Sequence, residues 1–140
     1  MCILPQTVIQ YSGPIISTQA LVQRGSVVLV RYPFTDLSTT KVRPAVVVTS
    51  NLLLSQMEDV LCLFISSVLP GELLPTDFVL EPTHPDFPAT GLRLRSVFRT
   101  HKLALLHQGL VLKKLGDLEG PLMREIDSRL QLALGLPIHP

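Results

Sequence analysis

The stretch that most constrains the fold of this chain is residues 24–51, which read RGSVVLVRYPFTDLSTTKVRPAVVVTSN. Two runs rich in β-branched residues, 27–32 and 45–49, are separated by a polar segment. Such runs favour strands, and the turn-forming residues between them predict two neighbouring strands. The first run is apolar at every position from Val27 to Val30. This predicts a strand that is buried on both faces or that belongs to a small barrel.

The polar segment between the two runs, residues 34–42, is predicted to be an exposed loop because it is rich in Thr, Ser and Asp. A second strand is predicted to begin at Arg43. Pro44 suits a strand start or a sheet edge, since proline donates no ladder hydrogen bond. A short helical turn is predicted within 51–59, followed by a third strand over 60–67.

Turn-forming residues divide the rest of the chain into short elements. We expect a fourth strand over 77–80, a proline-rich loop over 81–91, a half-exposed strand over 92–102 with a kink near Ser96, and a short strand over 110–113. Gly120 and Pro121 predict the start of a C-terminal helix that ends at Gly135. The pattern predicts an α+β, mainly β domain, a small and strongly bent sheet or barrel packed by a helix.

The distribution of charge bears on the partners that this domain can bind. The net charge is only +1, but the charges form blocks: those between Arg43 and Arg93 are acidic, and those between Asp86 and Asp117 are basic. A nearly neutral protein with this pattern can present a basic surface to phosphates.

Two cysteines are too few for a disulfide framework, and neither has a partner at metal-ligand spacing. We therefore expect no metal site and no cofactor, and the cysteine usage favours the reducing cytoplasm. Cys62, within VLCLFIS, is predicted to be a small buried hydrophobe.

Residues 1–23 are predicted to be an N-terminal extension, irregular or a strand-like arm, and residues 24–140 the folded domain. Pro5, Pro14 and several glutamines interrupt the apolar residues of the extension. It therefore has neither the pattern of a secretory signal nor that of a membrane span, and no membrane association is expected.

Four blocks of this sequence, in order, resemble toxins of the MazF/PemK family. The stretch over residues 24–51 resembles the family's opening strands, VLCLFISS its third strand, TGLRLRSVFRTHKL its later strand pair, and LGDLEGPLMREIDSRLQLALGL its C-terminal helix. The resemblance covers residues 24–136. It implies an SH3-like small barrel with a C-terminal helix.

The resemblance also implies a function. Members of this family are usually homodimers and act as the toxin of a type II toxin–antitoxin pair in the cytoplasm of bacteria or archaea. They are metal-independent endoribonucleases that cut single-stranded mRNA at short sequences, and a cognate antitoxin protein blocks their groove. This chain is expected to do the same.

Arg43 and Ser66 are the first two catalytic residues that the resemblance implies. Arg43 stands at the arginine of the family's RPA motif, and a guanidinium can bind two phosphate oxygens at once. Ser66 stands at the family's catalytic threonine and keeps the hydroxyl without the methyl that restrains χ1. The alternatives are a solvated Arg43, a Ser66 hydroxyl bonded to the local backbone, and Ser67 in the place of Ser66.

Arg99 and His101 stand where some members of the family have an arginine and a carboxylate two residues apart. In an extended strand both would point to the same face and reach one phosphate. Histidine in place of the carboxylate changes the acid–base chemistry, but imidazole is itself a proton carrier. The alternative is a solvated histidine beside Lys102.

Other residues are candidates for binding RNA outside the scissile position. Ser67 is one, and basic residues are expected to neutralise the RNA backbone, namely Lys41, Arg93, Arg95, Lys102, Lys113 and Lys114. Tyr32 and Phe34 border the first loop and are candidates for stacking on unpaired bases, although core packing competes for Phe34. The resemblance implies that the loop itself contributes to base recognition, as it does in the family.

Two other functions remain compatible with the sequence. The first is a protein-binding toxin of the gyrase-poison type, which has the same barrel and acts through its C-terminal helix. The second is a catalytically inactive relative that binds RNA or protein, which the serine and histidine replacements suggest.

Overall fold

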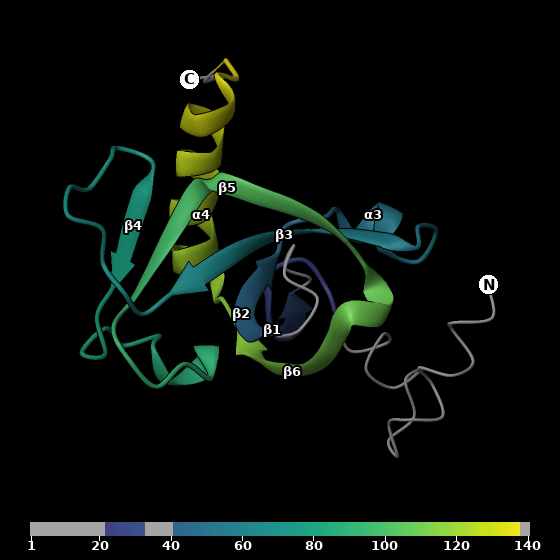
Figure 1. Ribbon diagram of the computed structural model, residues 1–140. Coiled ribbons are helices and arrows are strands. Elements are labelled where there is room, and N and C mark those ends of the chain that lie inside the picture. The colour runs from purple at the N-terminus through teal and green to yellow at the C-terminus, as the bar shows by residue number, and fades with distance from the viewer. Residues whose placement is uncertain (1–21, 33–40, 138–140) are drawn as a thin grey trace.

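The computed structural model describes residues 22–32 and 41–137 (Figure 1). Residues 1–21 of the N-terminal extension, Phe34 and nearly all of the first loop lie outside these ranges. The elements of the described part are β1 (Ser26–Tyr32), β2 (Lys41–Val47), α3 (Asn51–Leu54), β3 (Asp59–Ser66), β4 (Asp77–Leu80), the 3₁₀ helix η1 (Pro88–Thr90), β5 (Ser96–His107), the 3₁₀ helix η2 (Gln108–Leu110), β6 (Val111–Asp117) and α4 (Gly120–Leu134).

The described strands form one six-stranded antiparallel sheet in the order β4-β5-β3-β2-β1-β6. The sheet is strongly curled, and α4 packs against it near β4 and β5 (Figure 1). The predicted fold class is confirmed: the domain is mainly β with a C-terminal helix. Within the described ranges, pairing leaves β4 and β6 as edges, so the curled sheet is not a closed barrel.

Two glycines allow η1 to pack directly on β6, across the gap between the two edges. A Cβ on Gly91 would overlap the Leu115 carbonyl in β6, and a Cβ on Gly116 would overlap the backbone of Ala89 and Thr90. Gly91 also has a φ of +75°, a conformation that side chains other than that of glycine rarely adopt. The close approach of the two backbones therefore requires glycine at both positions.

The central strands are buried on both faces, as the apolar run in β1 predicted. Val27 and Val46 lie in a core that includes Ile126 of α4, whereas Val28 and Cys62 lie in a second core. Because successive residues of a strand point to opposite faces, an unbroken apolar run supplies both cores. Burial raises the pKa of the Cys62 thiol to about 12, which agrees with its predicted role as a buried hydrophobe.

The strand predicted over residues 92–102 starts later than expected, because β5 begins only at Ser96. The Ser96 hydroxyl donates a hydrogen bond of 2.8 Å to the Leu94 carbonyl, and Leu94 is 63% exposed. The alternation of leucine and arginine over 92–95 therefore belongs to an irregular segment with a bend at Leu94. Alternation alone does not distinguish a half-buried strand from an exposed turn whose leucine has no core to face.

The irregularity predicted near Ser96 lies further along β5. Leu63 of β3 pairs with Leu103 of β5, but Ile65, two residues on, pairs with Phe98. Residues 99–102 therefore form a wide bulge without partners on β3. The candidate residues Arg99, His101 and Lys102 all lie in this bulge.

Other boundaries shift slightly, and the C-terminal helix matches its prediction. β2 begins at Lys41 rather than Arg43, and β6 continues to Asp117. α4 spans Gly120–Leu134 and ends at Gly135, whose φ of 69° is left-handed. In the part of the chain that the structure describes, no helix is long and apolar enough to span a membrane.

Candidate active site

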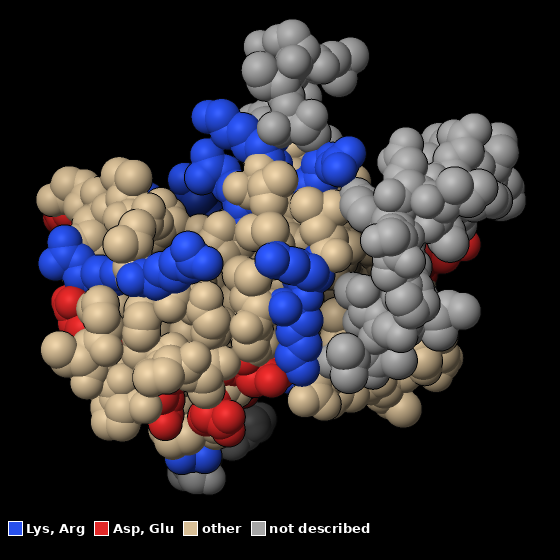
Figure 2. Space-filling model, turned by 90° about the horizontal axis from the view of Figure 1, so that it is seen from below, with Lys and Arg blue, Asp and Glu red and all other residues tan. Residues whose placement is uncertain are grey.

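Basic side chains are spread over one face of the molecule. Figure 2 shows several Lys and Arg side chains across the upper and middle part of this face, whereas most acidic side chains in view lie toward its lower edge and sides. Several candidate cations have acidic partners: Arg95 lies 4.0 Å from Glu81, Lys114 lies 3.1 Å from Asp117, and Arg99 is paired with Asp77. The predicted basic surface is thus present, although parts of it are neutralised.

A groove opens where β2 and β3 separate. β2 pairs with β1 from Lys41 to Val46, but it pairs with β3 only over Ala45, Val46 and Val47. Pro44 stands next to the last paired residue of β2, and it cannot donate a further ladder hydrogen bond. The proline of the RPA sequence therefore lies where the two strands part.

We call the resulting cavity of about 320 Å³ the β2–β3 groove. Its lining includes Arg43 from β2, Ser66 at the end of β3, Ser67 just after it, and Arg93 from the irregular segment before β5. The rest of the lining is Val42, Pro44, Ile65, Val68, Leu92, Leu94 and Ser96. The structure thus brings together Arg43 and Ser66, the two residues that the resemblance predicted to be catalytic, with the guanidinium of Arg93 beside them.

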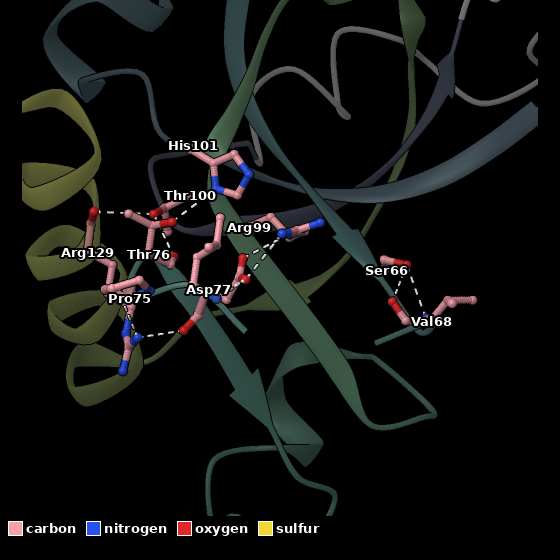
Figure 3. Close-up of polar contacts among 10 residues, drawn as sticks. Ser66, Val68, Pro75, Thr76, Asp77, Arg99, Thr100, His101 and Arg129 are labelled. Atoms are coloured by element: carbon pink, nitrogen blue, oxygen red, sulfur yellow. Dashed lines mark hydrogen bonds and ion pairs between the residues drawn. The ribbon is translucent and has the colours of Figure 1, made fainter. Parts of the chain in front are cut away.

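The Ser66 hydroxyl is engaged with the backbone of the turn that follows β3 (Figure 3). It accepts a hydrogen bond of 3.0 Å from the Val68 N–H and donates one of 3.2 Å to the Val68 carbonyl oxygen. This is the local backbone role that the sequence left open. These bonds hold the oxygen in place at the groove, and the hydroxyl proton must turn from the Val68 carbonyl before it can be donated to a phosphate.

Arg99 lies outside the β2–β3 groove and is paired with a buried carboxylate. Its Nε donates to Asp77 Oδ1 at 2.9 Å and its Nη2 to Oδ2 at 3.3 Å. The Asp77 side chain is 0% exposed and that of Arg99 is 23% exposed. Arg99 remains close to the groove in the sheet, because Ser66 pairs with Val97 on the adjacent strand.

The pKa of Asp77 reflects this pairing. Burial raises it, but the hydrogen bonds from Arg99 and the Leu74 N–H, with the charges of Arg99 and His101, outweigh burial and bring it below its ordinary value of 3.8. Asp77 is therefore an anion that orients the Arg99 guanidinium.

His101 is exposed, and its Nδ1 lies 3.0 Å from the Thr76 hydroxyl oxygen. This contact leaves Nε2 on the other side of the ring. In the view of Figure 3, the His101 ring lies beside the Arg99 side chain. Lys102, the next residue of the bulge, is also exposed.

The remaining candidates lie around the β1–β2 end of the sheet or on β6. Tyr32 pairs with Lys41 across β1 and β2. The Tyr32 ring packs edge-on against Phe64, with centroids 4.8 Å apart. Its ring is therefore part of the packing of the sheet. Lys113 is exposed on β6.

Sequence reasoning missed Thr76, Asp77 and Arg129. One sequence signal could have identified Asp77: it is a lone carboxylate at the start of the apolar strand DFVL. A charge that is buried in such a strand needs a partner of opposite charge. The pairing of β4 with β5, which sets Asp77 opposite Arg99, depends on the tertiary fold.

Comparisons with known proteins agree with this fold. A model of the PemK-like, MazF-like toxins of type II toxin–antitoxin systems matches residues 23–134. No significant match was found among curated proteins.

Several solved structures have the same fold. A mycobacterial endoribonuclease in complex with its cognate antitoxin is 20% identical, with a TM-score of 0.66, covering 84% of this chain and 98% of that one. The Mycobacterium tuberculosis toxin MazF-mt6 is 15% identical, with a TM-score of 0.65 and coverage of 81% and 99%. A MazE–MazF structure from Deinococcus radiodurans is 17% identical, with a TM-score of 0.65 and coverage of 82% and 96%. The family match and the shared fold together show that this chain belongs to the PemK-like, MazF-like toxins of type II toxin–antitoxin systems.

Proposed function

We propose that this toxin is an endoribonuclease that cuts single-stranded mRNA at the β2–β3 groove. The observation that carries the proposal is the presence of Arg43 and Ser66 in the lining of one groove, with Arg93 beside them. These residues come from separate parts of the sequence, and each was proposed from its own motif. The mycobacterial and M. tuberculosis relatives of this fold, named as an endoribonuclease and a toxin, support the same activity.

The residues of the site suit cleavage that uses the RNA's own 2′-hydroxyl. Its oxygen attacks the adjacent phosphorus and loses its proton, while the bond from phosphorus to the 5′ oxygen breaks and that oxygen gains a proton. The products are a 2′,3′-cyclic phosphate and a 5′-hydroxyl end. Arg43 binds the phosphate oxygens as negative charge develops, and the Ser66 hydroxyl turns from the Val68 carbonyl to donate a further hydrogen bond to them.

The proton transfers need a side chain that exchanges protons near neutral pH. Imidazole has this property, and His101 is exposed on the strand next to Ser66. We assign His101 as the proton carrier. Arg99 binds the reacting phosphate together with Arg43, and Lys41, Arg93 and Lys102 bind phosphates on either side of the cut.

The partners follow from the same reading. We propose a homodimer in the cytoplasm of a bacterium or archaeon, where mRNA is available. We also propose a cognate antitoxin that covers the groove. Relatives of this fold from mycobacteria and Deinococcus radiodurans are in complex with their antitoxins.

Incubating the purified protein, free of antitoxin, with a long single-stranded RNA in EDTA and mapping the new 5′ ends tests the activity. We expect discrete cuts with 5′-hydroxyl ends, and we expect Arg43→Ala to abolish them. Arg124→Ala is the matched control, because Arg124 is an exposed arginine of α4 that does not line the groove. Intact RNA with the folded wild-type protein would contradict the proposal.

One observation favours a second candidate, a toxin that binds a protein target through its C-terminal helix. Leu132 and Leu134 of α4, with Leu136 just beyond it, are 51%, 55% and 52% exposed. An exposed apolar helix end is a surface that a protein partner can cover. If RNA stays intact while purified gyrase is inhibited, this candidate replaces the nuclease.

A further inference from the structure

The bulge that carries Arg99 and His101 lacks the support that a regular strand would give. Residues 99–102 have no partners on β3, so the sheet on that side does not determine where their side chains point. A catalytic group must be held close to its working position, and a displacement of about 1 Å can cost on the order of 100-fold in rate. Some other part of the molecule must therefore position these two side chains.

Residues Thr76 and Asp77, at the start of β4, make these contacts. Both oxygens of the Asp77 carboxylate accept hydrogen bonds from Arg99, and Thr76 Oγ1 lies 3.0 Å from His101 Nδ1. One carboxylate that binds Nε and Nη2 sets the plane of the guanidinium. In the part of the chain that the structure describes, Nη1 of Arg99 makes no hydrogen bond. It is thus available to a phosphate.

The segment that contains Thr76 and Asp77 is itself anchored to α4. Arg129 of α4 donates from Nη1 to the Pro75 carbonyl at 2.9 Å and also to the Asp77 carbonyl. The Arg129 guanidinium also lies over the Phe78 ring, 5.5 Å from its centroid, and Glu125 accepts a hydrogen bond from its Nε at 2.7 Å. These contacts make the start of β4 a rigid support.

Thr100, which lies within the bulge, connects the bulge to both Thr76 and α4. Its hydroxyl oxygen lies 2.7 Å from the Thr76 carbonyl oxygen and 3.2 Å from the Arg129 carbonyl oxygen, and the residue is 0% exposed. Figure 3 shows these contacts running from α4 through the start of β4 to Arg99 and His101. The path joins the C-terminal helix to the bulge.

We propose that Asp77 and Thr76 are positioning residues of the nuclease: Asp77 directs Nη1 of Arg99 toward the RNA backbone, and Thr76 directs Nε2 of His101 toward the reacting oxygens. This inference rests on the proposed function and adds to it two residues that do not touch RNA. The buried Asp77 cancels the charge of Arg99, so the pair contributes orientation rather than net attraction for RNA.

This distinction makes the proposal testable by separating turnover from binding. Asp77→Asn keeps the shape of the side chain but removes its negative charge, so the site becomes more positive. RNA binding should be unchanged or tighter, while turnover falls because Arg99 is no longer held in one plane. A loss of attraction for RNA would instead raise KM.

The experiment measures kcat and KM on an oligonucleotide that spans a mapped cut, with thermal melts of each variant. We expect kcat to fall roughly 10- to 100-fold in Asp77→Asn, with KM unchanged or lower. Asp77→Asn should add no further loss in an Arg99→Ala background. Asp127→Asn is the control, because it removes a carboxylate that also binds an arginine through two hydrogen bonds, with Arg24, and neither residue lines the groove.

Thr76 gives a second test that does not depend on Asp77→Asn folding well. Thr76→Val should lower kcat and change the pH profile of cleavage, whereas Thr76→Ser should retain both. The inference would be overturned if Asp77→Asn and Thr76→Val both cut RNA at the wild-type rate, or if Arg99→Ala did. It would also be overturned if Asp77→Asn caused a further tenfold loss in the Arg99→Ala background. A wild-type protein that cuts no RNA would refute the proposed function instead.

Discussion

The carboxylate of Asp77 holds the guanidinium of Arg99 by two hydrogen bonds, one at 2.9 Å and one at 3.3 Å, between neighbouring strands. The two partners are unequal, because the Asp77 side chain is 0% exposed and that of Arg99 is 23% exposed. Removing either partner therefore has a different consequence. The arginine can turn to water, whereas the carboxylate cannot.

Arg99→Ala should destabilise the protein in a pH-dependent way. In the wild type, the lowered pKa of Asp77 means that its ionised form stabilises the fold above about pH 4, and this contribution is lost as the pH falls through the folded-state pKa. Without Arg99, burial dominates and the pKa rises. The variant should lose up to about 3–5 kcal/mol at neutral pH, and the deficit should shrink as the pH approaches 4.

Urea unfolding of wild type and variant at pH 7 and pH 4 measures this deficit. The double variant Asp77→Asn with Arg99→Ala is the control: it has no carboxylate at this position to titrate, so its deficit should change with pH less than that of Arg99→Ala. An Arg99→Ala deficit of the same size at both pH values would show that the Asp77 charge is not the cause.

Ser66 should contribute to cleavage through its hydroxyl. Ser66→Ala should lower the cleavage rate roughly 10- to 100-fold, because a hydrogen bond to the developing charge is lost. Ser66→Thr should retain activity or increase it, since the added methyl restrains χ1. Single-turnover cleavage of the mapped oligonucleotide provides the measurement. If Ser67→Ala is the impaired variant and Ser66→Ala is not, the role belongs to Ser67, which lines the same groove.

RNA binding should weaken steeply between roughly 50 and 200 mM salt, because several basic side chains release counterions from the backbone. For single-stranded RNA, the slope of log K against log salt is negative, and each lost phosphate contact makes it shallower by about 0.7. Arg43→Ala and Arg93→Ala should each do so, and Arg124→Ala should not. Fluorescence anisotropy with a labelled oligonucleotide measures the slope. A flat salt response in the wild type would argue against a basic groove.

Gly91→Ala and Gly116→Ala should both destabilise the fold at the contact between η1 and β6. The left-handed backbone of Gly91 alone costs an alanine about 1–2 kcal/mol, and the overlap with Leu115 adds to it. For Gly116 the overlap with Ala89 and Thr90 acts alone, at about 1–3 kcal/mol.

Gly71→Ala is the control for both glycines, because no atom lies within 4 Å of its added Cβ. Its free energy of unfolding should stay within about 0.5 kcal/mol of the wild type. If the melting temperatures of the three variants did not differ, η1 would move away from β6 at little cost in free energy.

Much of the fold was predictable because its signals are local. The apolar run of β1, the strand over Asp77–Leu80 and the helix limits at Pro121 and Gly135 depend on neighbouring residues alone. The start of β5 was not predictable. Alternation of leucine and arginine over 92–95 has the period of a strand. Only the exposure of Leu94, which does not pack on the core, distinguishes the irregular segment from a half-buried strand.

The same division applies to the site. The sequence by itself determined that Arg43 begins an RPA segment, that a serine ends the third strand, and that Arg99 and His101 are two residues apart. The tertiary structure decided which of them meet: Pro44 stands where β2 and β3 part, so Arg43 and Ser66 line one groove. It also placed Asp77 against Arg99 and Thr76 against His101. These partners come from strands that pair although their residues are more than 20 positions apart in the sequence. No local sequence pattern encodes such a pairing.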